Sequence, residues 1–572
     1  MTVMDRTEVA AALERIASYL ELRGENPFRV RAFRTATRTV EGLSGDLATA
    51  IADGTLAEAK GIGPAILEVI TELASTGRSE LFESLRHEVP PGLVEMLGIP
   101  GLGVARIRQI HTTLGLETLP ELEAAARDGR LALLPRFGER TAQNILKGIA
   151  FLRQASQWRL CHHAREEAEA LVAALGTVPH VLQAHAAGEV RRRTEVVREL
   201  VVVVVADVPP EEVFRSISEA VGVREIAGED ERRATLRMGG GTTVQVVVTP
   251  PQNVGAVLVQ ATGSEAHLAA LASHATARGF TLAGTALWQG NRFIPTPDEE
   301  TLYRALDLPW IPPELREDGG EVGRPVPPLV ERGDMLGFLH CHTTASDGSN
   351  NVAELARACR ADGYRWLGIT DHSRAASYAG GLGPDDVRRQ WDEIDAVNAA
   401  NPDIRVLKGV ESDILPDGSL DYPDEILAGF DFIIGSVHSR FAMSEAEMTA
   451  RFLRAIENPY LTLIGHPTGR LLLQRQAYPL DLDAVFAAAA AAGVGIEINA
   501  DPHRLDLDWR VLPAARKAGV MISIGADAHN IAGLANVDYG VAIARKGGLG
   551  PEAVLNSRDT DGFLAFARAR SR

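Results

Sequence analysis

Histidine, glutamate and aspartate residues recur at the ends of short apolar runs after residue 335. The seven runs are MLGFLHCH, YRWLGITDH, IRVLKGVE, FDFIIGSVH, LTLIGHP, VGIEINA and VMISIGADAH. Six of them finish on or beside side chains that bind metals: His340, His342, His372, Glu411, His438, His466, Asp527 and His529. Imidazole and carboxylate ligands without cysteine suit zinc, manganese or iron. The residue types therefore predict a centre for transition-metal ions.

The elements that must position these side chains follow a regular rhythm. Helical stretches such as VAELARACRADG and LDAVFAAAAAAG separate most of the runs, which indicates parallel strands in an α/β barrel. The carboxyl ends of barrel strands meet at one mouth, so side chains there share a pocket. His340 and His342 are two residues apart, as are Asp527 and His529, and this spacing predicts a shared face. Asp347, on the next loop, completes a set of nine.

The distribution of histidines argues against the alternative that these are ordinary core histidines. The chain has 15 histidines, of which seven follow residue 335. Six of those seven stand at run ends, and only His503 does not. Core packing would explain one or two such positions. Nine ligands exceed what one ion needs and suffice for two or three.

Length and composition limit the remaining possibilities. A chain of 572 residues predicts three or four domains. Three cysteines are too few for a disulfide framework, and with no signal peptide or apolar span the sequence predicts a cytoplasmic protein without membrane contact. The net charge of −18 argues against unspecific coating of nucleic acid but leaves local binding open. Arg29 and Arg31, in the acid-free stretch FRVRAFRTATR, are candidate DNA contacts, with a solvated helix face as the alternative.

Three turns in the first 150 residues share a pattern: KGIGPAI (60–66), IPGLGVARI (99–107) and LPRFGERTA (134–142). They resemble the helix-hairpin-helix motif, whose glycine-rich turn presents backbone N–H groups to a DNA phosphate. The third turn has Arg136 in place of the first glycine. The resemblance implies DNA contacts at four glycines: Gly61, Gly63, Gly101 and Gly103. Plain turns between antiparallel helices are the alternative.

The nine ligands resemble those of the PHP (polymerase and histidinol phosphatase) family of metal-dependent phosphoesterases, over about residues 335–572. The resemblance implies a distorted (β/α)7 barrel and two to three divalent ions, Mn²⁺, Zn²⁺ or Fe²⁺. It also implies three sites: His340, His342, Glu411 and Asp527; Glu411, His438 and His466; and Asp347, His372 and His529. Ions held there lower the pKa of water and so favour attack on phosphorus. Arg440 and Arg504 are candidate phosphate clamps, with surface residues as the alternative.

The stretches LELRGENPFRVRAFRTA, AGEVRRR and LYRALDLPWIPPELRED extend the resemblance to bacterial family X DNA polymerases, over essentially the whole chain. It implies a helical DNA-binding domain (1–85), a second helix-hairpin-helix region (86–154), an α+β palm and thumb (155–320), a linker (321–334) and the PHP barrel (335–572). The proline-rich segment 309–334 leads into the barrel.

The palm of that family reads roughly A-G-S-x-R-R-G-x-x-x-x-G-D-x-D, which Ala187, Gly188, Arg191 and Arg192 match. Other positions depart from it. Glu189 stands in place of the serine, and Arg193 and Arg198 stand in place of two glycines. Three aspartates are replaced by Glu199, Val201 and Gln245, and two aromatic residues are replaced by Gln260 and Ala261. Two-metal nucleotidyl transfer needs close carboxylates, so we expect polymerase activity to be lost. Val69 stands where some family members carry a lyase lysine, so that activity is not expected either.

These observations favour a phosphoesterase that processes DNA 3′ ends, as a 3′–5′ exonuclease or 3′-phosphatase, on gapped, nicked or 3′-blocked DNA. We expect His340, His342, Glu411, Asp527, His529 and Arg440 to carry the chemistry. Three alternatives stay open: a gap-filling polymerase that uses other carboxylates, a histidinol-phosphatase-type enzyme for small molecules, and a DNA-binding scaffold without activity.

Overall fold

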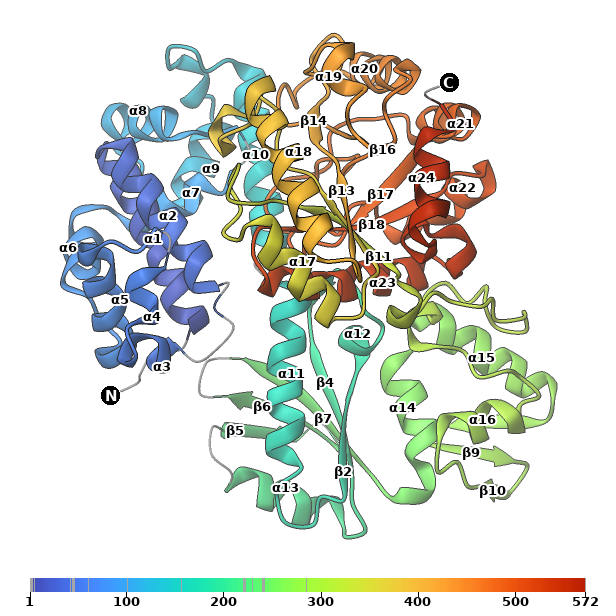
Figure 1. Ribbon diagram of the computed structural model, residues 1–572. Helices are drawn as coiled ribbons and strands as arrows, with labels where there is room; N and C mark the ends of the chain where they lie inside the picture. Colours follow the sequence, from blue (N-terminus) through green and yellow to red (C-terminus); the bar gives the residue numbers. More distant parts are fainter. Residues whose placement is uncertain are drawn as a thin grey trace. The chain divides into compact units, whose positions relative to one another are not determined.

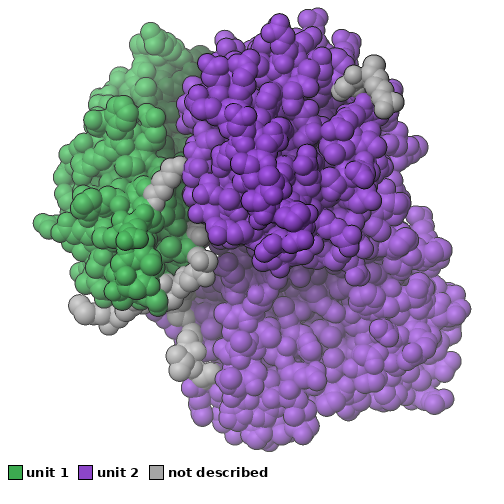
Figure 2. Space-filling model, in the orientation of Figure 1, with its two compact units in different colours: residues 1–157, 473–475 green, residues 158–472, 476–572 purple. Residues whose placement is uncertain are grey.

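The computed structural model of the protein describes residues 4, 6–41, 43, 47–59, 61–99, 101–155, 157–219, 223–228, 230–238, 242–283 and 285–570 (Figure 1). They form two compact units, residues 1–157 with 473–475, and residues 158–472 with 476–572 (Figure 2). Lys60 and Pro100, which belong to the glycine-rich turns, lie outside the described residues. No described helix is long and apolar enough to cross a membrane.

The first unit is built from helices, as expected: α1 (Arg6–Arg23), α2 (Pro27–Glu41), α3 (Leu47–Ala52), α4 (Thr55–Glu58), α5 (Pro64–Thr76), α6 (Glu80–Glu88), α7 (Pro91–Leu97), α8 (Val104–Leu114), α9 (Leu119–Arg127) and α10 (Glu139–Ala155). Its three turns follow one backbone path. Gly61, Gly101 and Arg136 have φ of 88°, 78° and 68°, in the left-handed region that favours glycine. A glycine then precedes α5, α8 and α10. The arginine in the third turn therefore keeps the hairpin geometry.

The second unit begins with a five-stranded sheet in the order β2-β4-β7-β6-β5. Its elements are β1 (Arg159–Leu160), α11 (Cys161–Leu175), β2 (Gln183–Ala187), α12 (Gly188–Arg191), β3 (Val196–Val197), β4 (Leu200–Val205), α13 (Pro210–Ser218), β5 (Val223–Gly228), β6 (Arg233–Met238), β7 (Thr243–Thr249) and α14 (Val254–Thr262). The valine run forms β4, between β2 and β7. Val202 and Val204 pack towards α11 and α13, whereas Val203 and Val205 pack towards α14. Both faces of β4 are buried, which explains why the run has no polar face.

A small thumb follows the sheet and includes part of the proline-rich segment. Its elements are α15 (Glu265–Ala277), β8 (Phe280–Ala283), β9 (Ala286–Gln289), β10 (Arg292–Ile294) and α16 (Glu299–Ala305). Ile311 and Leu315 pack into its core. The buried Arg316 forms a bidentate ion pair with Glu299, at 2.7 and 2.9 Å. The segment 309–334 therefore begins as a packed part of the thumb rather than as a free connection.

The last part of the second unit is the expected α/β barrel (Figure 1). Its parallel strands are β11 (Gly337–Cys341), β12 (Trp366–Ile369), β13 (Arg405–Lys408), β14 (Glu411–Asp413), β15 (Ile434–Ser436), β16 (Leu463–Ile464), β17 (Gly495–Asn499) and β18 (Ile522–Ala528). Its helices are α17 (Val352–Ala361), α18 (Pro384–Ala400), α19 (Asp424–Leu427), α20 (Glu445–Glu457), α21 (Leu482–Ala492), α22 (Leu512–Ala518), α23 (Val537–Lys546) and α24 (Thr560–Arg568). The strand order is β13-β12-β11-β18-β17-β16-β15-β14.

One apolar run, IRVLKGVE, forms two strands instead of the single strand expected. Gly409 and Val410 separate β13 from β14, so β13 pairs with β12 and β14 pairs with β15. A side chain on Gly409 would lie 2.4 Å from the ring of Phe432 and 2.5 Å from the carbonyl oxygen of Ile369. This close approach bends the chain. Because the two outermost strands of the sheet are neighbours in sequence, the sheet curls back on itself.

Candidate metal centre

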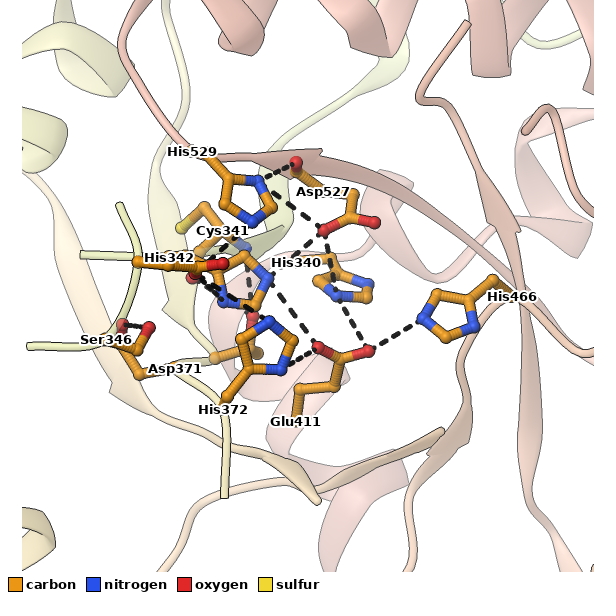
Figure 3. Close-up of polar contacts among 12 residues, drawn as sticks. His340, Cys341, His342, Ser346, Asp371, His372, Glu411, His466, Asp527 and His529 are labelled. Atoms are coloured by element: carbon orange, nitrogen blue, oxygen red, sulfur yellow. Dashed lines mark hydrogen bonds and ion pairs between the residues drawn. The ribbon is translucent and has the colours of Figure 1, made fainter. Parts of the chain in front are cut away.

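All nine predicted ligands lie on or just beyond the ends of the barrel strands. Figure 3 shows Glu411 with His340, His372 and His466 around it. Glu411 lies at their centre. Its carboxylate is 2.9 Å from His372 Nδ1 and 2.9 Å from His466 Nε2. His438 Nε2 and His340 Nε2 follow at 3.3 and 3.4 Å. One carboxylate, 1% exposed, thus faces four imidazoles from four different strand ends.

The other two carboxylates of the set, those of Asp527 and Asp347, lie close to the remaining histidines, His342 and His529. Asp527 Oδ1 is 3.2 Å from His342 Nε2 and 3.6 Å from His340 Nε2. Asp347 Oδ1 is 3.4 Å from His529 Nε2, 3.8 Å from His372 Nε2 and 3.9 Å from His342 Nδ1. Three overlapping groups have atoms close enough to share an ion: His342, Asp347, His372 and His529; His340, His342 and Asp527; and His372, Glu411 and His438.

The donor atoms of this centre fit divalent cations. Seven of these atoms are buried and form no hydrogen bond with any described residue: His340 Nε2, His342 Nδ1, Asp347 Oδ1, His372 Nδ1, Glu411 Oε2, His438 Nδ1 and His466 Nδ1. A buried polar atom without a partner costs about 1–3 kcal/mol, and this cost accumulates over neighbouring groups. Cations coordinated by these atoms would remove the cost. The mixture of imidazole and carboxylate suits zinc, manganese or iron.

The histidines and acids of the centre shift one another's pKa values. Burial by itself would raise the pKa of Glu411 and of Asp527, but the surrounding imidazoles hold both well below the usual range. Burial by itself would lower the pKa of His438 and of His529, but neighbouring carboxylates raise these values to about 10 and about 9. Protons on the imidazoles therefore balance the acids when cations do not.

The backbone around these ligands is irregular, which the simple alternation of a β-strand did not predict. His340, His466 and Asp527 have positive φ, at 60°, 23° and 51°. The pairing of β11 with β18 also shifts register between Leu339 and Cys341. His340 and His342 do lie together, with ring centroids 5.4 Å apart, but a local irregularity aims them rather than a regular pleat. Strained backbone of this kind is typical of functional sites.

Two buried acids behind the ligands were absent from the sequence prediction. Glu497, inside β17, accepts a 2.5 Å hydrogen bond from His340 Nδ1 and a 2.8 Å bond from the amide of His466. Asp371 accepts bonds from the amide and hydroxyl of Thr343, at 2.8 and 2.7 Å, and thereby fixes the loop after β11. The available signals were a glutamate inside the apolar run VGIEINA and the aspartate preceding His372. Such groups orient metal-binding imidazoles.

The two candidate arginines differ in position. Arg504 Nε lies 3.7 Å from Asp527 Oδ2, at the edge of the centre. Arg440 is exposed on the loop after β15, and among the described residues its side chain forms no hydrogen bond or ion pair with a ligand. Tyr378, which sequence reasoning missed, is 66% exposed, and its ring centroid lies 6.2 Å from that of His372 and 6.3 Å from that of His438. Arg504 and Tyr378 thus border the site.

Descriptions of known domains match four parts of the chain. A helix-hairpin-helix domain matches residues 4–79, and a SAM-like helix-hairpin-helix tandem matches residues 93–150. A DNA polymerase beta thumb matches residues 257–317, and a PHP domain matches residues 339–501. The helix-hairpin-helix domains, the polymerase thumb and the PHP domain expected from the sequence are therefore confirmed.

One relative spans the whole chain. The DNA polymerase/3′-5′ exonuclease PolX of Bacillus subtilis is 35% identical over 571 residues, which are 99% of this chain and 100% of that protein. The chain belongs to the PolX family. Probable phosphatases of Acetivibrio thermocellus and Caldanaerobacter subterraneus are each 32% identical over 28% of this chain, with 63% and 60% of those proteins covered. The full-length match to the Bacillus subtilis protein confirms the resemblance to family X polymerases.

The palm positions that depart from the PolX pattern, except Arg193, line one cavity of about 380 Å³: Glu189, Arg198, Glu199, Val201, Gln245, Gln260 and Ala261, beside Arg192. Glu189 and Glu199 are the only acids among its described lining residues. Val201 stands opposite Gln245 in the sheet, so the two neighbouring strands offer no carboxylate there. Glu189 Oε2 accepts a 2.6 Å bond from the amide of Arg198. Arg192 binds Glu317 at 2.9 Å and the carbonyl of Thr262 at 2.6 Å.

In the first unit, the DNA-contact candidates occupy turns and an exposed helix. Gly61, Gly63, Gly101 and Gly103 form the first two hairpin turns, directly before α5 and α8. Arg29 and Arg31 lie on α2. Arg29 is 3.6 Å from Glu25, and Arg31 stands over the ring of Phe28, which is 73% exposed. The solvated-face alternative stays open for both arginines.

Substituting Glu497→Gln keeps the size of the side chain and removes its charge from His340. We expect a loss of metal affinity of about 10- to 100-fold, because the imidazole loses the partner that orients it. Competition with a chelator measures this loss, and Glu393→Gln, on the exposed face of α18, is the matched control. Equal affinities in the two variants would contradict the orienting role.

Metal binding should release protons. Because the pKa of His438 is about 10 and that of His529 about 9, both imidazoles carry a proton at pH 7 before an ion binds. An ion coordinates only the neutral ring, so affinity should rise as pH increases from 7 to 9 and fall on acidification. Calorimetric titration with Mn²⁺ in two buffers of different ionisation heat measures the release. Identical heats in both buffers would count against these protonation states.

Proposed function

We propose that this chain is a metal-dependent phosphoesterase that trims or cleans DNA 3′ ends, as a 3′–5′ exonuclease or 3′-phosphatase. The observation that carries the proposal is the buried ligand set around Glu411 at the barrel mouth. The name of the Bacillus subtilis relative, which includes a 3′-5′ exonuclease, supports it. We assign to the centre two or three ions of Mn²⁺, Zn²⁺ or Fe²⁺, with Glu411 as the shared ligand.

Divalent ions at this centre would polarise a phosphate oxygen and favour deprotonation of a water molecule. The chain's own residues hold and orient the groups. Glu497 fixes His340 in one tautomer through its Nδ1. Arg504, beside Asp527, is placed to pair with a phosphate oxygen of the substrate. The exposed ring of Tyr378 offers a surface on which a terminal base stacks, a contact worth about 1–3 kcal/mol.

The proposal assigns delivery of DNA to residues 1–154. The three hairpin turns, including the one with Arg136, present backbone amides ahead of helices, as phosphate-binding turns do. We further propose that the palm and thumb, residues 155–320, support the DNA without copying it. Two carboxylates, Glu189 and Glu199, border the palm cavity, and one of them already holds a backbone amide. Two metal ions require more carboxylate than this.

Nuclease activity is tested with the purified protein, Mn²⁺ and a 5′-labelled gapped duplex, with and without deoxynucleotides. We expect shortening in both cases and extension in neither. His342→Ala should reduce shortening by more than about 100-fold and leave DNA binding unchanged, because it removes a ligand. His503→Ala, a barrel histidine outside the ligand set, is the matched control. Cleavage that survives His342→Ala would place the active site elsewhere, and hydrolysis of small esters alone would favour the histidinol-phosphatase type.

Restoring the palm acids alone should not restore a polymerase. The triple variant Glu199→Asp, Val201→Asp and Gln245→Asp supplies the carboxylates, but Glu189 still occupies the triphosphate position with its charge. Arg192 also remains bound to Glu317 and Thr262. Each defect costs about 10- to 100-fold in rate. Primer extension in a His342→Ala background, where product is not degraded, measures the outcome. Robust extension would mean that the nucleotide pocket is intact.

A further inference from the structure

A second cavity, of about 460 Å³, lies in the palm on the opposite side of α12 from the polymerase cavity. Residues of helices α11, α12 and α14 and of the edge strand β2 line it. Its inner wall is apolar and includes Val172, Val190 and Leu258. Three arginines stand around this wall: Arg165, Arg191 and Arg193. A cavity of this volume is within the range that holds a small ligand.

The charges around the cavity are not balanced. Arg165 is paired with Glu169 at 2.6 Å, and Arg191 is paired with Glu299 at 2.6 Å. Glu169 is the only acid among the described lining residues. The guanidinium of Arg193 forms no hydrogen bond and no ion pair with any described residue. The carboxylates of Glu314 and Glu169 act on this guanidinium only through space. One half-buried positive charge at the cavity therefore has no hydrogen-bonded partner, and such a charge favours an anion.

The backbone at Arg193 supports the same conclusion. Its φ is 58°, in the left-handed region, which a bulky residue adopts at a cost of about 1–3 kcal/mol and glycine adopts freely. The next residues are anchored, since the amide of Thr194 donates to the carbonyl of Glu189 at 3.2 Å and the side chain of Glu195 is buried. The chain thus holds a strained, unpaired arginine in a fixed place. Burial and the charge of Arg165 also lower the pKa of Arg193.

We propose that this cavity binds the phosphate group of a nucleotide, with Arg193 as its main ligand and Arg165 as a second. The guanidinium fork of arginine matches phosphate oxygens, and the apolar wall suits the sugar or base next to them. His185 lies on β2 at the same cavity and adds a neutral ring nitrogen. This site is separate from the polymerase cavity, which Glu189 and Arg198 line, and from the metal centre.

The test uses the variant Arg193→Gly in the full chain. Because glycine relieves the strained φ, the variant should fold and melt at no lower a temperature than the unchanged protein. Calorimetric titration with deoxyadenosine monophosphate and with inorganic phosphate should show binding weakened by about 10- to 100-fold, the effect of losing one charged hydrogen-bonding group. The control Arg198→Gly removes an exposed arginine from the other side of α12 and should bind as before.

Two further measurements distinguish the sources of the phosphate. Hydrolysis of p-nitrophenyl phosphate should be unchanged in Arg193→Gly, because the metal centre is intact. If free nucleotide does not bind, but a gapped duplex binds more weakly to Arg193→Gly than to Arg198→Gly, the phosphate comes from the DNA backbone. The proposal is overturned if Arg193→Gly binds nucleotide, phosphate and DNA like the unchanged protein, or if both variants lose binding equally.

Discussion

The buried carboxylate of Glu411 is the constraint around which the barrel mouth is organised. A charge this deep needs compensation from its surroundings, and the imidazoles of His340, His372, His438 and His466 surround it. The bend at Gly409 makes this possible, since it lets β14 leave β12 and pair with β15. Glu411, the first residue of β14, then lies between the ends of neighbouring strands rather than along one of them.

A second buried acid joins the palm to the barrel. Glu195 accepts hydrogen bonds from Arg510 at 3.0 Å and from Trp509 at 3.2 Å, and it lies 3.4 Å from Arg470. Arg470 in turn donates to the carbonyl of Arg504 at 3.0 Å, beside the metal centre. Two side chains therefore connect the palm with the edge of the site. The palm thus contacts the barrel close to the metal centre.

Much of this architecture could be predicted because its signals are local. Alternating strands and helices indicate the barrel, and ligands at strand ends indicate where they meet, whatever the details of packing. The rest depends on contacts between distant residues. The break in the third strand follows from Gly409 against Phe432, and the role of Glu497 appears only when His340 lies beside it. The positive φ of His340 and Asp527 was likewise not predictable from the sequence, because most histidines and aspartates have negative φ even though both types adopt positive φ more often than other residues.

The same reasoning explains how a palm keeps its fold while its polymerase site changes. Val202 and Val204 pack against α11 and α13, so the core on that face does not depend on the residues that border the cavity. Val201 is on the other face, opposite Gln245 and next to Ala261. The side chain of Val201 adds apolar contact with α14 at this position. Because the strands pack through their valines, the sheet keeps its core whether or not the residues that border the cavity carry charge.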